Sequence, residues 1–280
     1  MTLSKIAEIA KFFTSNALLL ALDGPLVVLF GFMLYGIDVN ITIIAASFLG
    51  VFSIYTLNKA TDKKEDSINK PYQFSRPTAH YIAVSFVTMI LSLILGALVS
   101  LFTFLILLTP TLVGILYSVR VSTRLPRLKE VVGAKSVLVA LSWSLYGAFL
   151  PLTLHGSNFP NIALVFTYIF IQVMINTVMF DFFDVKGDRE SGIRTLPTVL
   201  KAKKTKKMLF LVNTALAIII TFCGIEGYFL NVLPALFFGV VYSYFIIWHF
   251  IREPINRLSA ELMIDGSWFP LVTFVKILIR

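Results

Sequence analysis

Long apolar segments joined by short polar connections dominate this chain of 280 residues. Hydrophobic residues make up 58% of the sequence and charged residues 14%, whereas roughly a quarter of the residues in a soluble domain are charged. The mean hydropathy is +0.87. Inside a bilayer every backbone polar group must be satisfied within the protein, and apolar segments of about 20 residues satisfy them as helices. The sequence therefore predicts an all-α, polytopic membrane protein.

The apolar segments fit about nine transmembrane helices with short connections. We place these helices at residues 16–35, 40–58, 79–99, 101–118, 134–154, 161–182, 207–225, 229–250 and 262–279. Residues 1–15 lack a long apolar core and a small-residue cleavage site, so we expect an amphipathic helix on the membrane surface rather than a signal peptide. No separate soluble domain is evident, and residues 1–280 are expected to form a single membrane domain.

Lysine and arginine are distributed very unevenly over the connections. Of the 24 such residues, all except Lys276 and Arg280 fall in the N-terminal segment or after the second, fourth, sixth and eighth predicted helices. The alternate connections hold none; they centre on Gly36, Ser100, Gly156 and Gly227. The positive-inside rule places the N-terminus and the basic connections in the cytoplasm and the C-terminus outside. Membrane topology thus explains the net charge of +9, and the charge does not indicate nucleic-acid binding.

Aspartates gather at the ends of two predicted helices on this cytoplasmic side. After the second apolar segment, Asn58, Asp62 and Asp66 have i, i+4, i+8 spacing, which gives one face if the helix continues. After the sixth segment a second group has i, i+3, i+7 spacing and again shares one face; it consists of Asp181, Asp184 and Asp188. Carboxylates crowded in this way repel one another unless metal lies between them. The two groups therefore predict a site for divalent cations.

Cations and prolines flank both acidic groups. Two Lys/Arg-Pro pairs follow the first group and predict a stiff cytoplasmic cap loop. Two arginines follow the second group, and a lysine begins the fifth predicted helix. As candidate anion donors we consider Lys70, Arg76, Lys135, Arg189 and Arg194. For any one of these cations, membrane topology alone is the alternative explanation.

The charges narrow the choice of ligand. The aspartates contribute about −5, two Mg²⁺ ions about +4 and the candidate cations about +5, which together suit a diphosphate of charge about −3. Hard oxygen ligands without a nearby cysteine or histidine disfavour zinc and copper. We expect two Mg²⁺ ions, for which Mn²⁺ can substitute. An apolar cavity beneath a diphosphate suits an isoprenoid substrate, because it keeps water from an allylic carbocation.

The two acidic groups and their flanking residues resemble the two signatures of the UbiA-type intramembrane prenyltransferase superfamily. The first signature corresponds to residues 58–71 with Arg76 and Pro77, and the second to residues 181–197. Leu116-Tyr117-Ser118 and the following Lys135 also fit the family's connection between the fourth and fifth helices. The resemblance covers essentially the whole chain.

The resemblance implies a helical bundle around a large lateral cavity with cytoplasmic cap loops. It implies Mg²⁺-dependent transfer of a prenyl group from an isoprenyl diphosphate, such as geranyl or geranylgeranyl diphosphate, to a lipophilic acceptor through an allylic carbocation within the membrane. The resemblance implies that six residues bind Mg²⁺ and, through the metal, the diphosphate: Asn58, Asp62, Asp66, Asp181, Asp184 and Asp188. It also implies direct contacts with the phosphates from Lys70, Arg76, Lys135 and Arg194. Tyr117 would stabilise the carbocation or the leaving oxygens, unless it is an aromatic anchor at the membrane interface.

This chain departs from the family pattern at two places. Many members have an aspartate where this chain has Lys59, and many carry an arginine near the start of the first helix, where this chain has Ser15 and Asn16. The first departure alters the local charge. The second puts diphosphate contacts from the first helix in doubt.

Several alternatives stay open at the level of sequence. A cation-coupled transporter also needs membrane acids, although it would place them nearer the bilayer centre, and a structural scaffold would have no use for them. Asp23, before Gly24-Pro25, either sits at a helix kink or lines the cavity. The acceptor is first expected to be aromatic, a quinone precursor, and next a glycerol-phosphate ether lipid, haem or a carotenoid. The first four and second four helices are consistent with a pseudo-repeat, to which a ninth helix is added.

Overall fold

The structure is a computed structural model that describes residues 5, 8, 12, 13, 16–69, 76–118, 130–154, 156–251 and 257–279. In these ranges every regular element is a helix and none is a strand. The α-helices are α2 (Leu18–Tyr35), α3 (Ile41–Thr61), α4 (Lys63–Asn69), α5 (Thr78–Val99), α6 (Leu101–Ser118), α7 (Ala134–Phe149), α8 (Phe159–Glu190), α9 (Leu196–Ile225), α10 (Leu233–Phe250), α11 (Arg257–Ile264) and α12 (Trp268–Leu278). Short 3₁₀ helices are η2 (Pro151–Thr153), η3 (Leu230–Val232) and η4 (Asp265–Ser267). The surface helix expected at 1–15 lies almost wholly outside the described residues.

Within the described residues, 7 helices are long and apolar enough to cross a membrane: α2, α3, α5, α6, α8, α9 and η3 with α10. The predicted fifth and ninth spans correspond to α7 and α12, which are shorter, with 16 and 11 residues. Pro151 lacks the N–H that a continuing helix needs, and the chain passes there into η2. The ninth span is divided by η4. The all-α membrane fold is confirmed, and the count of nine is approximate.

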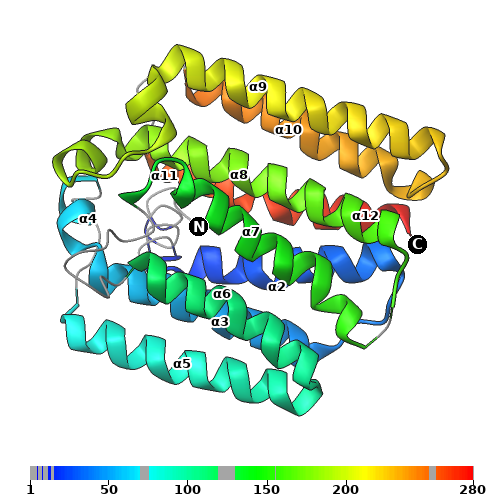
Figure 1. Ribbon diagram of the computed structural model, residues 1–280, viewed down its shortest axis with the longest axis horizontal. Helices are drawn as coiled ribbons and strands as arrows, with labels where there is room; N and C mark the ends of the chain where they lie inside the picture. Colours follow the sequence, from blue (N-terminus) through cyan, green and yellow to red (C-terminus); the bar gives the residue numbers. More distant parts are fainter. Residues whose placement is uncertain are drawn as a thin grey trace.

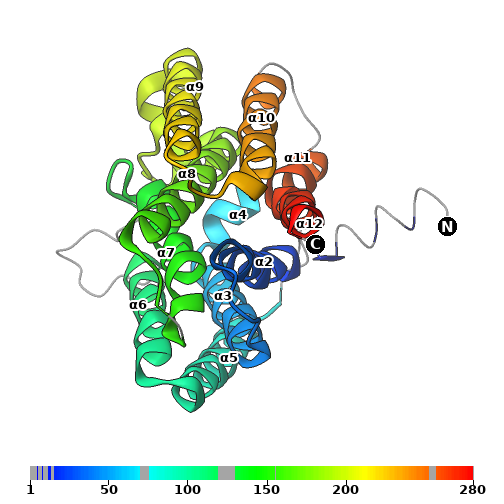
Figure 2. The same cartoon turned by 90° about the vertical axis from the view of Figure 1, so that its right-hand side faces the viewer.

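The helices lie side by side along the length of the molecule (Figure 1). The α9–α10 pair forms one edge and α5 the opposite edge, with α8, α12, α7, α2, α6 and α3 between them. Figure 2 views the bundle nearly end-on and shows α4 within its outline. The end of α3, the short helices α4 and α11 and the end of α8 all lie at one end of the bundle, and the C-terminus lies at the other (Figure 1). The two acidic groups are therefore brought to the same end.

Aromatic side chains join helices that are distant in the sequence. The Phe30 ring in α2 stacks on Tyr168 in α8, with ring centroids 5.3 Å apart, and meets Trp268 in α12 edge-on at 5.6 Å. The Tyr168 hydroxyl donates to the backbone oxygen of Leu236 in α10 at 3.3 Å. Each ring is almost completely buried. These contacts hold the first, sixth, eighth and ninth predicted spans together.

Small and hydroxyl-bearing residues let the other helices approach closely. Gly31 in α2 faces Gly147 in α7, and a Cβ added to Gly31 would overlap the Gly147 carbonyl oxygen. In α5, the Ser85 and Ser92 hydroxyls donate to backbone oxygens of α3 at 2.8 and 2.7 Å. Close contact through small residues and interhelical hydrogen bonds is typical of membrane bundles, where lipid removes the hydrophobic driving force between helices.

Candidate active site

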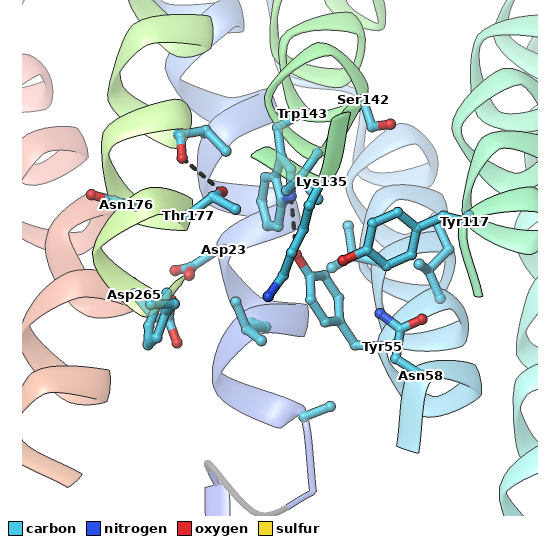
Figure 3. A pocket seen from close by; sticks show the side chains of 18 of the residues that line it. Asp23, Tyr55, Asn58, Tyr117, Lys135, Ser142, Trp143, Asn176, Thr177 and Asp265 are labelled. Carbon is cyan, nitrogen blue, oxygen red and sulfur yellow. Dashed lines mark hydrogen bonds between the residues drawn. The ribbon is translucent and has the colours of Figure 1, made fainter. Parts of the chain in front are cut away.

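Most of the predicted acids line one cavity between the helices. Its lining comes from α2, α3, α4, α6, α7, α8, α11, η4 and α12, and much of it is apolar or aromatic. Four of the predicted acids line it: Asp62, Asp66, Asp181 and Asp184. Asn58, Tyr117 and Lys135 line it as well (Figure 3). The structure thus brings residues of both signatures to one space.

The first acidic group lies at a joint between two helices. The α3 helix ends at Thr61, and Asp62 has non-helical backbone angles (φ −104°, ψ 18°) before α4 begins. The helical hydrogen bonds nevertheless continue across the joint: the Asp62 N–H donates to Asn58 O and the Asp66 N–H to Asp62 O, both at 2.8 Å. The helix therefore does not continue unbroken past Thr61, but all three side chains still line the same cavity.

Neighbouring hydroxyl groups hold this first group in place. The Thr61 hydroxyl donates to Asp62 Oδ1 at 2.8 Å, and the Ser118 hydroxyl, at the end of α6, donates to Asn58 Oδ1. Tyr117, next to Ser118, is buried and faces the cavity beside Tyr55 (Figure 3). The Trp143 indole N–H donates to the Tyr55 hydroxyl at 3.3 Å. Aromatic rings from α3, α6 and α7 thus meet in the cavity beside Asn58.

The second acidic group lies on a single continuous helix. The α8 helix runs to Glu190, past the predicted end at 182, so the i, i+3, i+7 spacing is realised without a break. Lys135 lies at the start of α7, and its Nζ is 2.7 Å from Asp181 Oδ1 and 3.7 Å from Asp188 Oδ2. Ser136 Oγ donates to Asp181 Oδ2 at 3.1 Å. These contacts offset the negative charges of two acids that are almost completely buried.

Arg257, at the start of α11, is a cation of this site that the sequence patterns did not single out. Its guanidinium nitrogens lie 2.7 Å from Asp184 Oδ1 and 3.0 Å from Glu261 Oε1. Nη1 also donates to the backbone oxygen of Asn69 at 3.1 Å, while Nη2 is buried and has no hydrogen-bond partner among the described residues. Burial by itself lowers the pKa of Arg257, but the two carboxylates raise it above its ordinary value. Arg257 is therefore a permanent positive charge on the cavity wall.

Asn69 fastens α4 to α8 beside this arginine. The backbone N–H of Gly187 donates to Asn69 Oδ1 at 2.9 Å. A Cβ at Gly187 would overlap the Asn69 side chain, so glycine is needed for this close approach. The end of the first signature is thus attached directly to the second.

The remaining predicted cations are placed differently. Arg76, Arg189 and Arg194 are exposed and are not among the residues that line the cavity in the described part of the chain. The Arg76 guanidinium lies 3.1 Å from His80 Nε2. Asp188 is also outside the lining and faces Lys135. Lys70 lies outside the described residues.

The acids fit a metal ion that is shared with a phosphate group. Among the described residues, no group of three or more His, Cys, Asp and Glu side chains is placed to hold a metal ion by itself. Mg²⁺ commonly takes only one or two carboxylates and completes its octahedron with phosphate oxygens and water. Carboxylates of both groups line one cavity, where Lys135 and Arg257 pair with the second group, and this arrangement matches the donor set.

Two further acids in the cavity lining were not predicted from the sequence. Asp265 lies in η4 and Glu261 in α11, and both are buried cavity-lining acids. Asp265 falls within the predicted ninth span, and an acid inside an apolar segment is itself a signal of function. Glu261 follows Arg257 at i+4, the spacing of a helical ion pair.

The comparisons with known proteins agree with this geometry. Residues 12–268 match the model of the UbiA prenyltransferase family. A UbiA homologue from Archaeoglobus fulgidus bound to GPP and Mg²⁺ has a TM-score of 0.73 at 17% identity, covering 96% of this chain and 99% of that one. A digeranylgeranylglyceryl phosphate synthase has a TM-score of 0.62 at 14% identity, covering 99% and 98%.

A third solved structure, the apo form of a UbiA homologue from Aeropyrum pernix K1, has a TM-score of 0.65 at 13% identity, covering 92% of this chain and 96% of that one. The comparison with curated protein sequences returns no match. At these identities the solved structures establish the shared fold, and the family model, which spans nearly the whole chain, establishes the lineage. This chain is a member of the UbiA prenyltransferase family, as its two acidic signatures implied.

Proposed function

We propose that this prenyltransferase uses Mg²⁺ to transfer a prenyl group from an isoprenyl diphosphate to a lipophilic acceptor inside the membrane. The observation that carries the proposal is the convergence of both acidic groups, Lys135 and Arg257 on one cavity with a largely apolar lining. The Archaeoglobus fulgidus homologues of the same fold, bound to GPP or DMAPP with Mg²⁺, support the choice of substrate and metal.

Residues of both signatures would bind the diphosphate end. Asn58, Asp62, Asp66, Asp181 and Asp184 are the candidates to hold Mg²⁺, which supplies positive charge to the diphosphate oxygens as the allylic C–O bond breaks. Lys135 and the unpaired nitrogen of Arg257 would donate to the leaving diphosphate. Their positive charges are fixed in the cavity wall before the reaction begins, so little reorganisation is needed.

The rest of the lining would protect the carbocation. Apolar side chains from α2, α3, α6 and α7 exclude water from the space below the acids, and the rings of Tyr55, Tyr117 and Trp143 present π faces that stabilise positive charge. The acceptor would then attack the allylic carbon. An aromatic quinone precursor is our first candidate, and a glycerol-phosphate ether lipid, the class named for one structural neighbour, is the second.

We also propose that the acid-bearing end faces the cytoplasm. All connections at this end carry lysine or arginine, and those at the opposite end carry none. Arg76, Arg189 and Arg194 then lie in cytoplasmic segments, where they would attract the diphosphate before it enters the cavity.

The test uses purified protein with Mg²⁺, labelled geranylgeranyl diphosphate and a panel of acceptors. We expect prenylated product from the wild type and no product from Asp62→Ala or Asp184→Ala, with both variants still eluting as folded protein in detergent. Asp38→Ala removes an exposed acid from the α2–α3 connection at the other end of the bundle and should keep full turnover. Retained turnover in both cavity variants would overturn the assignment of the acids.

A further inference from the structure

The cavity contains a second acidic region that diphosphate binding does not use. Asp23 in α2 lines the cavity and is only 2% exposed, and its Oδ1 has no hydrogen-bond partner in the described part of the chain. Asp265 in η4 is its electrostatic neighbour, and the two carboxyl groups lie next to each other in Figure 3. A buried carboxylate oxygen without a partner is unfavourable for folding, so it points to a ligand that completes it.

This region lies across the cavity from Asn58 and Tyr117. Figure 3 shows Asp23, Asp265 and Asn176 on one side and Tyr117 and Asn58 on the other. Along α8, Asn176 precedes Asp181 by five residues, so the region is about 7 Å farther from the acid-bearing end of that helix. That separation is on the scale of a second small substrate placed beside the prenyl diphosphate.

The region is held in place by defined hydrogen bonds. Asn176 Nδ2 donates to the backbone oxygen of Ile264 at 3.2 Å and lies 3.4 Å from Ser267 Oγ. These contacts attach both ends of η4 to α8, and Asp265 lies between them. The carboxyl group of Asp265 is therefore positioned by the fold rather than carried on a loose connection.

The charge of the region selects the chemistry of its ligand. Glu261, 4% exposed, adds a second carboxylate oxygen without a hydrogen-bond partner in the described residues, while its other oxygen contacts Arg257. Three acids line this part of the cavity, and Arg257 is already shared with Asp184. A carboxylate or phosphate would be repelled here, whereas an uncharged hydroxyl group would donate a hydrogen bond to the open oxygen.

We propose that Asp23 and Asp265 form the acceptor subsite and bind an uncharged hydroxyl group of the acceptor. The inference rests on the proposed function and makes it more specific: the end of the acceptor that enters this region carries a hydroxyl and no carboxylate. The hydroxyl can belong to a phenol ring or to a glycerol lipid whose phosphate stays outside the region. Both present the same donor to Asp23.

The experiment compares three acceptors with geranylgeranyl diphosphate and Mg²⁺. They are 1,4-dihydroxynaphthalene (neutral phenol), a glycerol ether lipid phosphate with a free hydroxyl, and 4-hydroxybenzoate (carboxylated phenol). We expect the wild type to prenylate one of the first two in preference to 4-hydroxybenzoate. In Asp23→Asn and Asp265→Asn the KM of that acceptor should rise roughly 10-fold, because an amide oxygen accepts a weaker hydrogen bond than a carboxylate oxygen does, and the KM of the diphosphate should change less than about twofold.

The matched control is Asp38→Asn, the same change at an exposed position at the other end of the bundle. It should alter neither KM. Asp23→Asn should unfold no earlier than the wild type on heating, because Asp23 Oδ1 loses no hydrogen bond. A purely structural role would instead lower the unfolding temperature and leave the ratio of the two KM values unchanged.

Binding provides a readout that does not depend on catalysis. Trp143 and Trp268 line the cavity, so the two acceptors without a carboxylate should quench tryptophan fluorescence of the wild type more strongly than of Asp23→Asn. Quenching without any prenylated product would contradict the proposed function and leave the subsite standing. Preference for 4-hydroxybenzoate, or unchanged acceptor KM and quenching in both Asn variants, would overturn the subsite.

Discussion

Replacing Arg257 with alanine tests the contact that joins α11, α8 and α4. The substitution removes a cation that lies 2.7 Å from Asp184 and 3.0 Å from Glu261 and that also donates to the backbone of Asn69. Removing one partner of a buried ion pair destabilises by about 3–5 kcal/mol. Asp184 is 17% exposed on the cavity wall, where water can replace part of the lost contact, so we expect the lower end, about 3 kcal/mol.

The assay is equilibrium unfolding by SDS in mixed micelles, followed by tryptophan fluorescence. A loss of about 3 kcal/mol reduces the ratio of folded to unfolded protein roughly a hundredfold. Arg257→Lys keeps the charge but lacks the planar fork that reaches both acids, so we expect an intermediate loss of about 1–2 kcal/mol. Lys204→Ala removes an exposed cation from α9 and should stay within about 0.5 kcal/mol of the wild type.

A double-mutant cycle separates the ion pair from other effects. Asp184→Ala and Arg257→Ala should each destabilise, and together they should destabilise by less than the sum, with a coupling of about 1–3 kcal/mol. If Arg257→Ala unfolds like Lys204→Ala, or if the two cavity substitutions are additive, Arg257 does not link these helices and the reasoning fails.

Three other perturbations bear on the packing and on the metal. Gly187→Ala should destabilise by about 1–3 kcal/mol in the same unfolding assay and reduce turnover, because its methyl group would displace Asn69; Gly156→Ala, in open space, is the control. Gly31→Ala should cause a similar loss by pushing α2 from the Gly147 backbone, and near-wild-type unfolding would contradict the close crossing. EDTA should abolish product formation, and excess Mg²⁺ should restore it. Without diphosphate, EDTA should hardly move the unfolding midpoint, since the described residues form no protein-only metal cage; a large shift would argue for such a cage.

The shared location of the acids could be predicted because it depends on few physical rules. Asp62 follows the second apolar segment and Asp184 follows the sixth. Four crossings lie between these two connections, and an even number of crossings returns the chain to the same side of the bilayer. Counting spans and basic loops therefore placed both groups at one end, where the structure has them. Lys135 was a candidate anion donor at the start of the fifth predicted helix, and the structure places it in the cavity lining, in contact with Asp181.

Other features depend on contacts that no local pattern carries. The joint at Asp62 has no glycine or proline to signal it, since the local sequence is Ala60-Thr61-Asp62-Lys63. Arg257 was counted with the topological charges, because it lies in the connection between the predicted eighth and ninth spans. Its partners Asp184 and Asn69 are 73 and 188 positions away in sequence, so only the tertiary structure could connect it to the two acidic groups.

The joint at Asp62 makes the two signatures mechanically unequal. One unbroken helix of 32 residues carries Asp181, Asp184 and Asp188, so the spacing between these acids is fixed. Asp62 is itself the joint and Asp66 lies beyond it in α4, so rotation about the Asp62 backbone alters the distance between these two carboxylates. Under the proposed function, the first signature therefore supplies acids whose spacing can adjust to the bound diphosphate, while the second supplies acids whose spacing is fixed by α8.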